Sequence, residues 1–160
     1  VSGGVDSMVL LDLIIRVGHP ISNLSVGHFD HQIRQNSRDD YLFVENYCRQ
    51  NGINFYGKTA DVPAYCQNNK LSLEEAARHL RYDFLRQIKL QNKADFIITA
   101  HHGDDSAETI LFNFIRGSFL KGLMGMDVSS RDLLRPLLSF YRHDILIYAE
   151  EQKIDFVEDE

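Results

Sequence analysis

Cysteine is scarce in this sequence, and signatures of several protein classes are missing from it. Among its 160 residues are two cysteines, Cys48 and Cys66, which form no Cys-x-x-Cys pair, so neither a zinc ribbon nor a redox pair is indicated. No apolar run approaches the roughly 20 residues that a membrane-spanning helix needs, and no basic-then-apolar leader opens the chain. We therefore expect a soluble, cytoplasmic protein.

Positive charge is also in short supply. The net charge is −6, and an acidic chain is a poor non-specific binder of nucleic acid because phosphate contacts rest on Lys and Arg. The basic residues are nevertheless grouped along the chain, at Arg34 and Arg38, at Arg78, Arg81, Arg86 and Lys89, and at Arg116 and Lys121. Such groups give only weak support for an RNA partner, because they are more often solvated helix surface.

Helix and strand signals alternate along the chain. Helical spacing of apolar residues is found at 8–15, 37–50, 105–116 and 139–153. Short apolar strands are predicted at 24–29, 53–56, 95–100 and 154–157. The strongest helix signal is the capping box Ser72-Leu73-Glu74-Glu75, which an apolar stripe follows.

This alternation favours an α/β fold in which a parallel sheet is flanked by helices on both faces, because parallel neighbours need helical crossovers. The length and the 44% hydrophobic content predict a single domain spanning residues 1–160. In such sheets, ligands gather beyond the carboxyl ends of the strands. The polar strings that follow the predicted strands are therefore the candidate functional residues.

The first of these strings, Val1 to Ser7, reads Val-Ser-Gly-Gly-Val-Asp-Ser and stands directly before a helical run. Gly3 and Gly4 allow backbone to approach a ligand and allow the positive φ angles of a nest of N–H groups. Placed at a helix N-terminus, that nest suits a phosphate. Asp6 would be repelled there unless a divalent cation intervened, which indicates Mg²⁺ with a nucleotide. The alternative is a turn that merely caps the helix.

Two further strings carry histidine and aspartate. One is His28-Phe29-Asp30-His31, and the other is His101-His102-Gly103-Asp104-Asp105, which opens a helix. If their strands neighbour the phosphate loop, the second string brings carboxylates toward it and makes a second metal or acid–base site. Asp105, with Glu108 three residues later, also fits a helix cap. Both strings equally offer the ligand types of a two-metal phosphoesterase, which needs no ATP.

Basic residues supply the remaining candidates. Arg81 lies on the capped helix, where a guanidinium near a phosphate site can stabilise the charge on departing pyrophosphate. The alternative is an exposed helical arginine. Residues 116–118 and 121–126 form a glycine-rich basic loop, which is either a mobile cover or a flexible connection.

Residues 2–7 read Ser-Gly-Gly-x-Asp-Ser, which resembles the PP-loop of the ATP pyrophosphatases, enzymes that split ATP between the α- and β-phosphates. A Walker loop would need a Gly-Lys-Ser/Thr ending, which is missing here. The ordered motifs beyond the PP-loop are similar to those of the bacterial tRNA(Ile)-lysidine synthetases and cover nearly the whole chain. They are His28-Phe29-Asp30-His31 with Arg34, Glu75-Ala76-Ala77-Arg78 with Arg81-Tyr82, Thr99 to Asp105 with Ala107-Glu108-Thr109, Arg116-Gly117-Ser118, Gly122 to Met126, Arg135-Pro136-Leu137-Leu138 and Glu158-Asp159.

The resemblance implies a Rossmann-like three-layer sandwich of the adenine nucleotide alpha hydrolase type. It also implies an amino-terminal catalytic domain that is truncated at both ends, without the carboxy-terminal tRNA-binding domains of longer relatives. Phe119 departs from the family pattern, because it stands where a glycine is expected.

The implied reaction is ATP-dependent ligation of lysine to C2 of the wobble cytidine of isoleucine tRNA with a CAU anticodon. An adenylylated cytidine is the intermediate, and AMP and pyrophosphate are released. The implied partners are that tRNA and free lysine, and homodimer formation is left open. The residues expected to hold the ATP phosphates are Ser2, Gly3, Gly4, Val5, Asp6 and Ser7.

Three of the residues carry implied catalytic roles. Asp6 would place Mg²⁺, Arg81 would neutralise phosphate charge, and Asp105 would bind the metal or orient the lysine amine.

Three different functions compete with this ligase. A tRNA thiolase would share the loop but usually needs catalytic cysteines, which Cys48 and Cys66 do not resemble. A metal phosphoesterase would hydrolyse its substrate without ATP, and a non-catalytic module would bind the nucleotide without turning it over.

Overall fold

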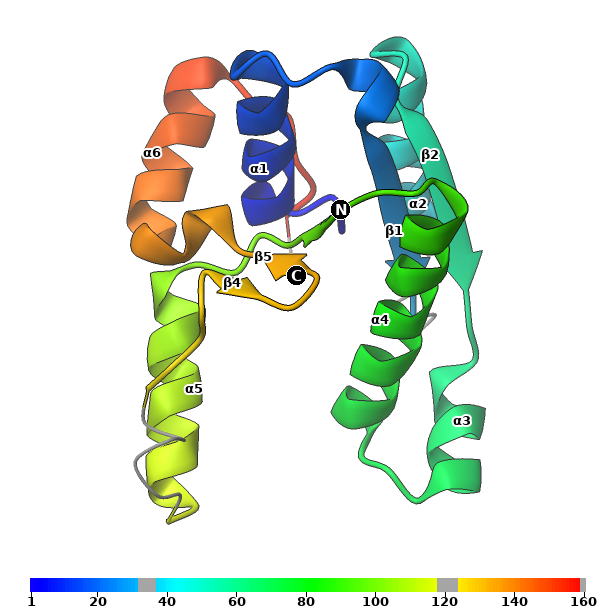
Figure 1. Cartoon of the computed structure of the whole chain (residues 1–160), viewed down its shortest axis with the longest axis vertical. Coiled ribbons are helices and arrows are strands. Elements are labelled where there is room, and N and C mark those ends of the chain that lie inside the picture. The colour runs from blue at the N-terminus through cyan, green and yellow to red at the C-terminus, as the bar shows by residue number, and fades with distance from the viewer. Residues whose placement is uncertain (32–36, 118–123, 159–160) are drawn as a thin grey trace.

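The computed structural model describes residues 1–31, 37–117 and 124–158. Figure 1 shows the arrangement of the helices and strands. In chain order they are α1 (Val5–Arg16), β1 (Ser25–Asp30), α2 (Ser37–Gln50), β2 (Asn54–Thr59), α3 (Val62–Asn69), α4 (Leu73–Gln91), β3 (Ile97–Ile98), α5 (Gly103–Ile115), β4 (Ser129–Ser130), β5 (Leu133–Leu134) and α6 (Arg142–Gln152), with 3-10 turns at Ile21–Asn23 and Pro136–Ser139. No helix in these ranges is long and apolar enough to cross a membrane.

The strands pair in two groups. β1 and β2 are parallel along their whole length, with Ser25 opposite Asn54, whereas β3 pairs parallel with β5, which β4 joins antiparallel. The amino terminus lies between the two groups (Figure 1) and is hydrogen-bonded along β1. The Val1 amine donates to the Gly27 carbonyl at 2.8 Å, and Nδ1 of His28 lies 3.0 Å from the Val1 carbonyl oxygen. The predicted parallel pairing is therefore present, but the strands do not form one continuous sheet.

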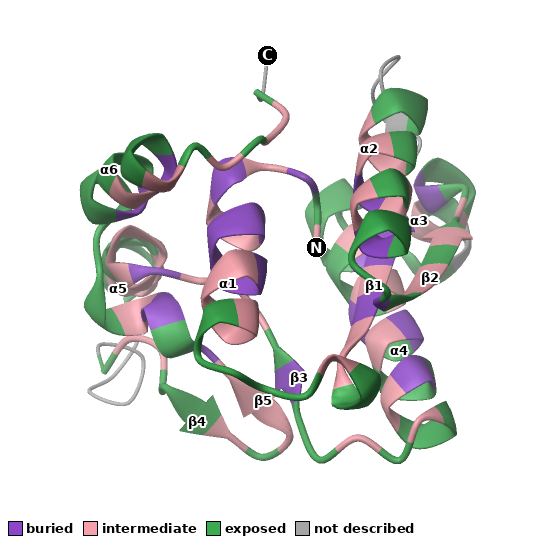
Figure 2. Cartoon of the chain, turned by 90° about the horizontal axis from the view of Figure 1, so that it is seen from above, coloured by how far each residue is buried: buried purple, intermediate pink, exposed green. Residues whose placement is uncertain are grey.

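Helix α1 is the central helix of the molecule. Figure 2 shows it between α6 on one side and α2 with β1 on the other. Val9 and Leu10 pack in a cluster with Ile145 and Ala149 of α6, while Leu11 packs in a cluster with residues of β1 and α2. A helix that is apolar on most of its surface must be buried on several sides. The position of α1 therefore follows from its sequence.

The predicted helices are confirmed. Helix α4 begins with the predicted capping box, in which the Ser72 hydroxyl accepts from the Glu75 N–H at 3.2 Å and the Glu75 carboxylate accepts from the Ser72 N–H at 3.0 Å. Ala76, Phe84 and Ile88 of its apolar stripe are buried. Helix α5 begins two residues earlier than predicted, and α6 begins three residues later.

The strand predictions are less accurate. The strands predicted at 24–29 and 53–56 are present, but the one at 95–100 is reduced to two residues, and 154–157 is not a strand. In that last segment, the Val157 N–H donates to the Gly3 carbonyl at 3.0 Å, which ties it to the PP-loop. Helix α3 was not predicted, although Asp61 caps it by accepting from the Ala64 N–H at 2.9 Å.

The close contact between β1 and α4 leads to a stability prediction. A Cβ atom at Gly27 would lie 2.7 Å from Leu85 Cδ2 and 2.9 Å from Ile88 Cδ1. The variant Gly27→Ala should therefore lose about 1–3 kcal/mol in free energy of unfolding, because the extra methyl overpacks this contact. Urea denaturation measures the loss. The control Ser25→Ala on the same strand should change it by less than about 0.5 kcal/mol, and equal midpoints for the two variants would contradict the packing argument.

Candidate active site

The Ser-Gly-Gly-x-Asp-Ser loop stands at the amino end of α1. Gly4 is the N-cap residue and gives α1 no side-chain cap. Gly3 has a φ of +103°, which is the positive φ expected of the glycine pair, and a Cβ there would meet Val44 Cγ2 at 3.4 Å. Glycine adopts this backbone conformation without strain. The loop therefore presents the uncapped, electropositive end of a buried helix.

The backbone N–H groups of the loop converge on serine hydroxyls. The Ser7 hydroxyl accepts from the Ser2 N–H at 3.1 Å and the Gly3 N–H at 3.2 Å, and it donates to the Gly4 carbonyl at 2.9 Å. The Gly4 N–H donates to the Ser2 hydroxyl at 3.3 Å. Three successive N–H groups thus point at oxygen atoms, as in an anion-binding nest.

Three carboxylates from two helices meet around the buried His102 ring. Its Nε2 lies 3.8 Å from Oδ2 of Asp6 and 3.7 Å from Oδ2 of Asp105, and its Nδ1 lies 3.4 Å from Oδ2 of Asp104. His102 is 5% exposed. The fold therefore brings the acidic residues of the second His/Asp string beside the PP-loop aspartate, as the order of the motifs leads one to expect.

Asp105 also stabilises the amino end of α5. Its Oδ2 accepts from the His102 N–H at 2.8 Å, which makes it the third-position acid of a capping arrangement with His102 as the N-cap. The predicted cap, Asp105 paired with Glu108, is therefore wrong, because α5 begins at Gly103 and Asp105 stands inside its first turn. The observed cap fixes the orientation of the Asp105 carboxylate next to His102.

Arg142, the first residue of α6, is a site residue that the sequence motifs do not predict. Its Nη1 lies 3.2 Å from Oδ2 of Asp6, and its backbone N–H donates to Oδ2 of Asp104 at 2.7 Å. One residue thus contacts acidic side chains of both α1 and α5. No local signal identifies it, because the contact joins residues 136 positions apart.

Arg81, the third residue with a predicted catalytic role, lies on α4. It is half-buried, and no carboxylate of the described residues lies within ion-pair distance of it. Burial lowers the pKa of Arg81. After burial, the Arg81 charge is the next cause that lowers the pKa of His31, and it also contributes to the lowered pKa of His101. The guanidinium therefore lies near both His/Asp strings, and the exposed-arginine interpretation does not describe it.

Two histidines of these strings have structural partners. The His28 ring lies edge-on against Tyr41, with 5.5 Å between centroids, and is 4% exposed. Nδ1 of His101 lies 2.8 Å from the Thr99 hydroxyl. Within the described ranges, no group of three or more His, Cys, Asp or Glu side chains is arranged to hold a metal ion.

The glycine-rich loop is described from Met124 onward. A Cβ at Gly125, whose φ is +72°, would lie 2.6 Å from Ser106 Oγ, and the Met126 N–H donates to that oxygen at 3.1 Å. This half of the loop is therefore held against α5. The motif residues outside the described ranges are Arg34, Ser118, Phe119, Lys121, Gly122, Leu123 and Asp159.

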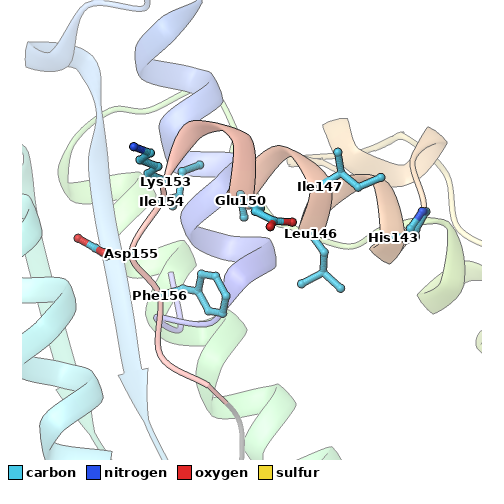
Figure 3. A pocket seen from close by; sticks show the side chains of 9 residues that line it. His143, Leu146, Ile147, Glu150, Lys153, Ile154, Asp155 and Phe156 are labelled. Carbon is cyan, nitrogen blue, oxygen red and sulfur yellow. The ribbon is translucent and has the colours of Figure 1, made fainter.

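A cavity of about 520 Å³ borders α6 and the segment after it (Figure 3). Leu146, Ile147 and Phe156 contribute apolar side chains, and Glu150 contributes a carboxylate. None of the predicted site residues lines this cavity. We therefore assign the candidate active site to the PP-loop and the acidic residues around His102.

The whole chain, residues 1–160, matches the family described as the PP-loop domain, and the chain belongs to that family. Comparison with curated proteins gives more specific relatives within this family. The chain is 44% identical over 160 residues to the tRNA(Ile)-lysidine synthase of Thermosipho africanus, 38% identical over 160 residues to that of Pseudothermotoga lettingae, and 40% identical over 161 residues to that of Chlorobaculum tepidum. Each match covers 99% of this chain but 38%, 36% and 49% of the relative, respectively.

Solved structures confirm the fold class. The U34-tRNA thiolase NcsA of Methanococcus maripaludis, solved with its 4Fe-4S cluster, matches with a TM-score of 0.79 and 20% identity over 99% of this chain and 57% of its own. The NH3-dependent NAD synthetase of Campylobacter jejuni, in complex with nitrate, matches with a TM-score of 0.67 and 16% identity over 96% of this chain and 62% of its own. These likenesses establish an α/β fold of the adenine nucleotide alpha hydrolase type.

The buried histidines give a pH prediction. Burial is the main cause that lowers the pKa of both His28 and His101 from 6.5 to about 4. Because the folded pKa lies below the unfolded value, their contribution to stability is complete above about pH 6.5 and is lost as pH falls toward about 4. Imidazole resonances followed by NMR should titrate with midpoints of about 4. The variant His28→Gln assigns one of the two resonances, and midpoints near 6.5 would show that the rings are solvated.

Proposed function

We propose that this chain is the ATP-binding catalytic part of an enzyme that ligates lysine to C2 of the wobble cytidine of isoleucine tRNA with a CAU anticodon. The main support is the nest of N–H groups at the uncapped end of α1, next to Asp6 and near the half-buried Arg81. The named lysidine synthases, at 38–44% identity, support the substrate assignment. The chain spans between about a third and a half of their length.

In this proposal the loop residues 2–7 hold the phosphates of ATP. Phosphate oxygens would replace the Ser7 hydroxyl as the acceptor for the Ser2 and Gly3 N–H groups. The hydroxyl now accepts hydrogen bonds from these two groups at 3.1 and 3.2 Å. The positive end of α1 would add its partial charge. Glycine at position 3 lets the backbone approach the phosphate without a Cβ in the way.

Asp6 and Asp105 would hold Mg²⁺. The carboxylates of both approach Nε2 of His102 within 4 Å, at 3.8 and 3.7 Å. Mg²⁺ binds through one or two carboxylates together with substrate phosphates, so a cage of three protein ligands is not required. When bound, the cation neutralises phosphate charge. Asp6 would then exchange its ion pair with Arg142 for a contact with the cation.

The chemistry takes two steps. The C2 oxygen of the cytidine attacks the α-phosphorus of ATP, pyrophosphate leaves, and Arg81 stabilises the charge that develops on the departing phosphates. The ε-amine of lysine then attacks C2, loses a proton, and displaces AMP, which carries the former C2 oxygen. Activation is needed because the ring oxygen is a poor leaving group and AMP is a good one. Asp105 would orient the lysine amine in the second step.

A tRNA thiolase function is less well supported than the ligase function. Burial raises the pKa of the Cys48 thiol to about 11, and both Cys48 and Cys66 are free. Catalytic cysteines have lowered pKa values, because the thiolate is the reactive form. The likeness to NcsA, at 20% identity, concerns the fold.

Cytoplasmic location, homodimer formation and truncation of the domain at both ends remain predictions.

The products of ATP cleavage test the proposed function. With ATP, lysine and isoleucine tRNA bearing a CAU anticodon, the protein should release AMP and pyrophosphate in equal amounts, because attack occurs at the α-phosphorus. Without the tRNA, neither product should accumulate. Chromatography of radiolabelled nucleotide distinguishes the products, and formation of ADP and phosphate would contradict the proposal.

The role of Arg81 is tested by Arg81→Gln. Loss of a cation that stabilises developing charge should lower the rate of pyrophosphate release about 10²-fold. The matched control is Arg49→Gln, which removes an exposed arginine of α2 that donates to Asn46. The control should retain the full rate, and near-normal release by the Arg81 variant would remove Arg81 from the mechanism.

A further inference from the structure

Three arginines of α4 surround one buried tyrosine. The guanidinium carbons of Arg78, Arg81 and Arg86 lie 5.0, 5.6 and 5.8 Å from the centroid of the Tyr82 ring. Tyr82 is 7% exposed, and its hydroxyl has no hydrogen-bond partner among the described residues. We call Arg78, Arg81, Tyr82 and Arg86 the Tyr82 cluster.

Three members of the cluster, Arg78, Tyr82 and Arg86, line a cavity of about 550 Å³ between α4 and β5. Two acids, Glu75 and Asp83, also line it, and of the two only Asp83 forms an ion pair with an arginine of the cluster. The Glu75 carboxylate accepts from the Ser72 N–H and hydroxyl at 3.0 and 2.7 Å, and Asp83 lies 3.8 Å from Arg86. Asp132 of the β4–β5 turn lies 3.9 Å from Arg86. These long ion pairs neutralise one guanidinium of the three at most.

Like charges held this close repel one another. The charge of Arg78 adds to burial in lowering the pKa of Arg81. Cation–π contacts with Tyr82 offset part of the repulsion, but no carboxylate of the described residues pairs with Arg78 or Arg81. On a chain of net charge −6, this concentration of cations is a local exception. An anionic ligand would relieve the repulsion among these guanidinium groups.

We propose that the Tyr82 cluster binds the phosphodiester backbone of single-stranded RNA beside the nucleotide that is modified. This inference rests on the proposed function, because Arg81 connects the cluster to the candidate active site. Arg78 and Arg86 are eight residues apart, or about 12 Å along the helix, so they can contact more than one phosphate. Surfaces that bind single-stranded nucleic acid use a row of cationic side chains that follows the backbone, and the buried Tyr82 ring would here position the guanidinium groups.

An extended RNA fits the cluster better than a small anion does. A single carboxylate or phosphate pairs with one guanidinium or with two adjacent ones, whereas Arg78 and Arg86 are eight residues apart on α4. A strand of RNA carries a charge on every nucleotide and follows the helix. The cluster would therefore hold the strand, and Arg81 would remain directed at the phosphates of ATP.

The test measures RNA binding at several salt concentrations. The protein is titrated into a labelled anticodon stem-loop of isoleucine tRNA with a CAU anticodon, and fluorescence anisotropy gives the affinity. Each phosphate contact with a single strand contributes about −0.7 to the slope of log K against log salt. Arg86→Gln should therefore reduce the slope by about 0.7 and weaken binding, and Arg78→Gln should do the same.

The control Arg49→Gln removes an equal charge from α2 and should leave the slope unchanged. Circular dichroism verifies that each variant is folded, and the Arg86 side chain is 52% exposed, so its loss should not disturb the core. A slope that is the same in Arg86→Gln, Arg78→Gln and the unaltered protein would overturn the proposal.

Calorimetric titration with ATP separates this inference from the function on which it rests. If the unaltered protein binds no ATP, the proposed function fails, whatever the RNA slopes are. If ATP is bound and the slopes are insensitive to Arg78 and Arg86, only the Tyr82 cluster assignment fails.

Discussion

The burial of α1 is the constraint on which the rest of the structure depends. Met8, Val9 and Leu11 are at most 2% exposed, so the helix cannot shift without opening clusters on two sides of the molecule. Because α1 is fixed, its uncapped amino end and the loop before it are also fixed. The N–H groups of that loop then point at one place, and the carboxylate of Asp6 projects toward α5 and α6.

The electrostatics of the site follow from this placement. Acidic side chains of α1 and α5 share one buried imidazole. The Arg142 guanidinium pairs with Asp6, and the Arg142 backbone N–H donates to Asp104. On the other side, the half-buried Arg81 lies near both His/Asp strings without a carboxylate partner among the described residues. The site thus has an acidic half suited to a cation and a basic half suited to phosphate. In the proposed function, the acidic half would hold the cation and Arg81 would contact the phosphates.

Features that depend on neighbouring residues could be predicted from the sequence. The capping box at Ser72 and the apolar helix after the PP-loop are local patterns, and both are present. Features that depend on distant residues could not. Arg142 meets Asp6 only because α6 packs on α1. The segment 154–157 is held by backbone hydrogen bonds from Ile154 to Ala149 and from Val157 to Gly3 rather than by a strand ladder. Helix α3 has a local signal in its Asp61 cap, but its apolar pattern is too weak to predict a helix.

The internal hydrogen bonds of the PP-loop have a thermodynamic consequence. The Ser7 hydroxyl already keeps the Ser2 and Gly3 amides oriented, so the loop is preorganised before any nucleotide arrives. Ordering a flexible loop on association would reduce affinity, and this loop avoids most of that entropic penalty. In the proposed function, binding of the triphosphate would exchange one oxygen acceptor of these amides for another, with little change in the loop.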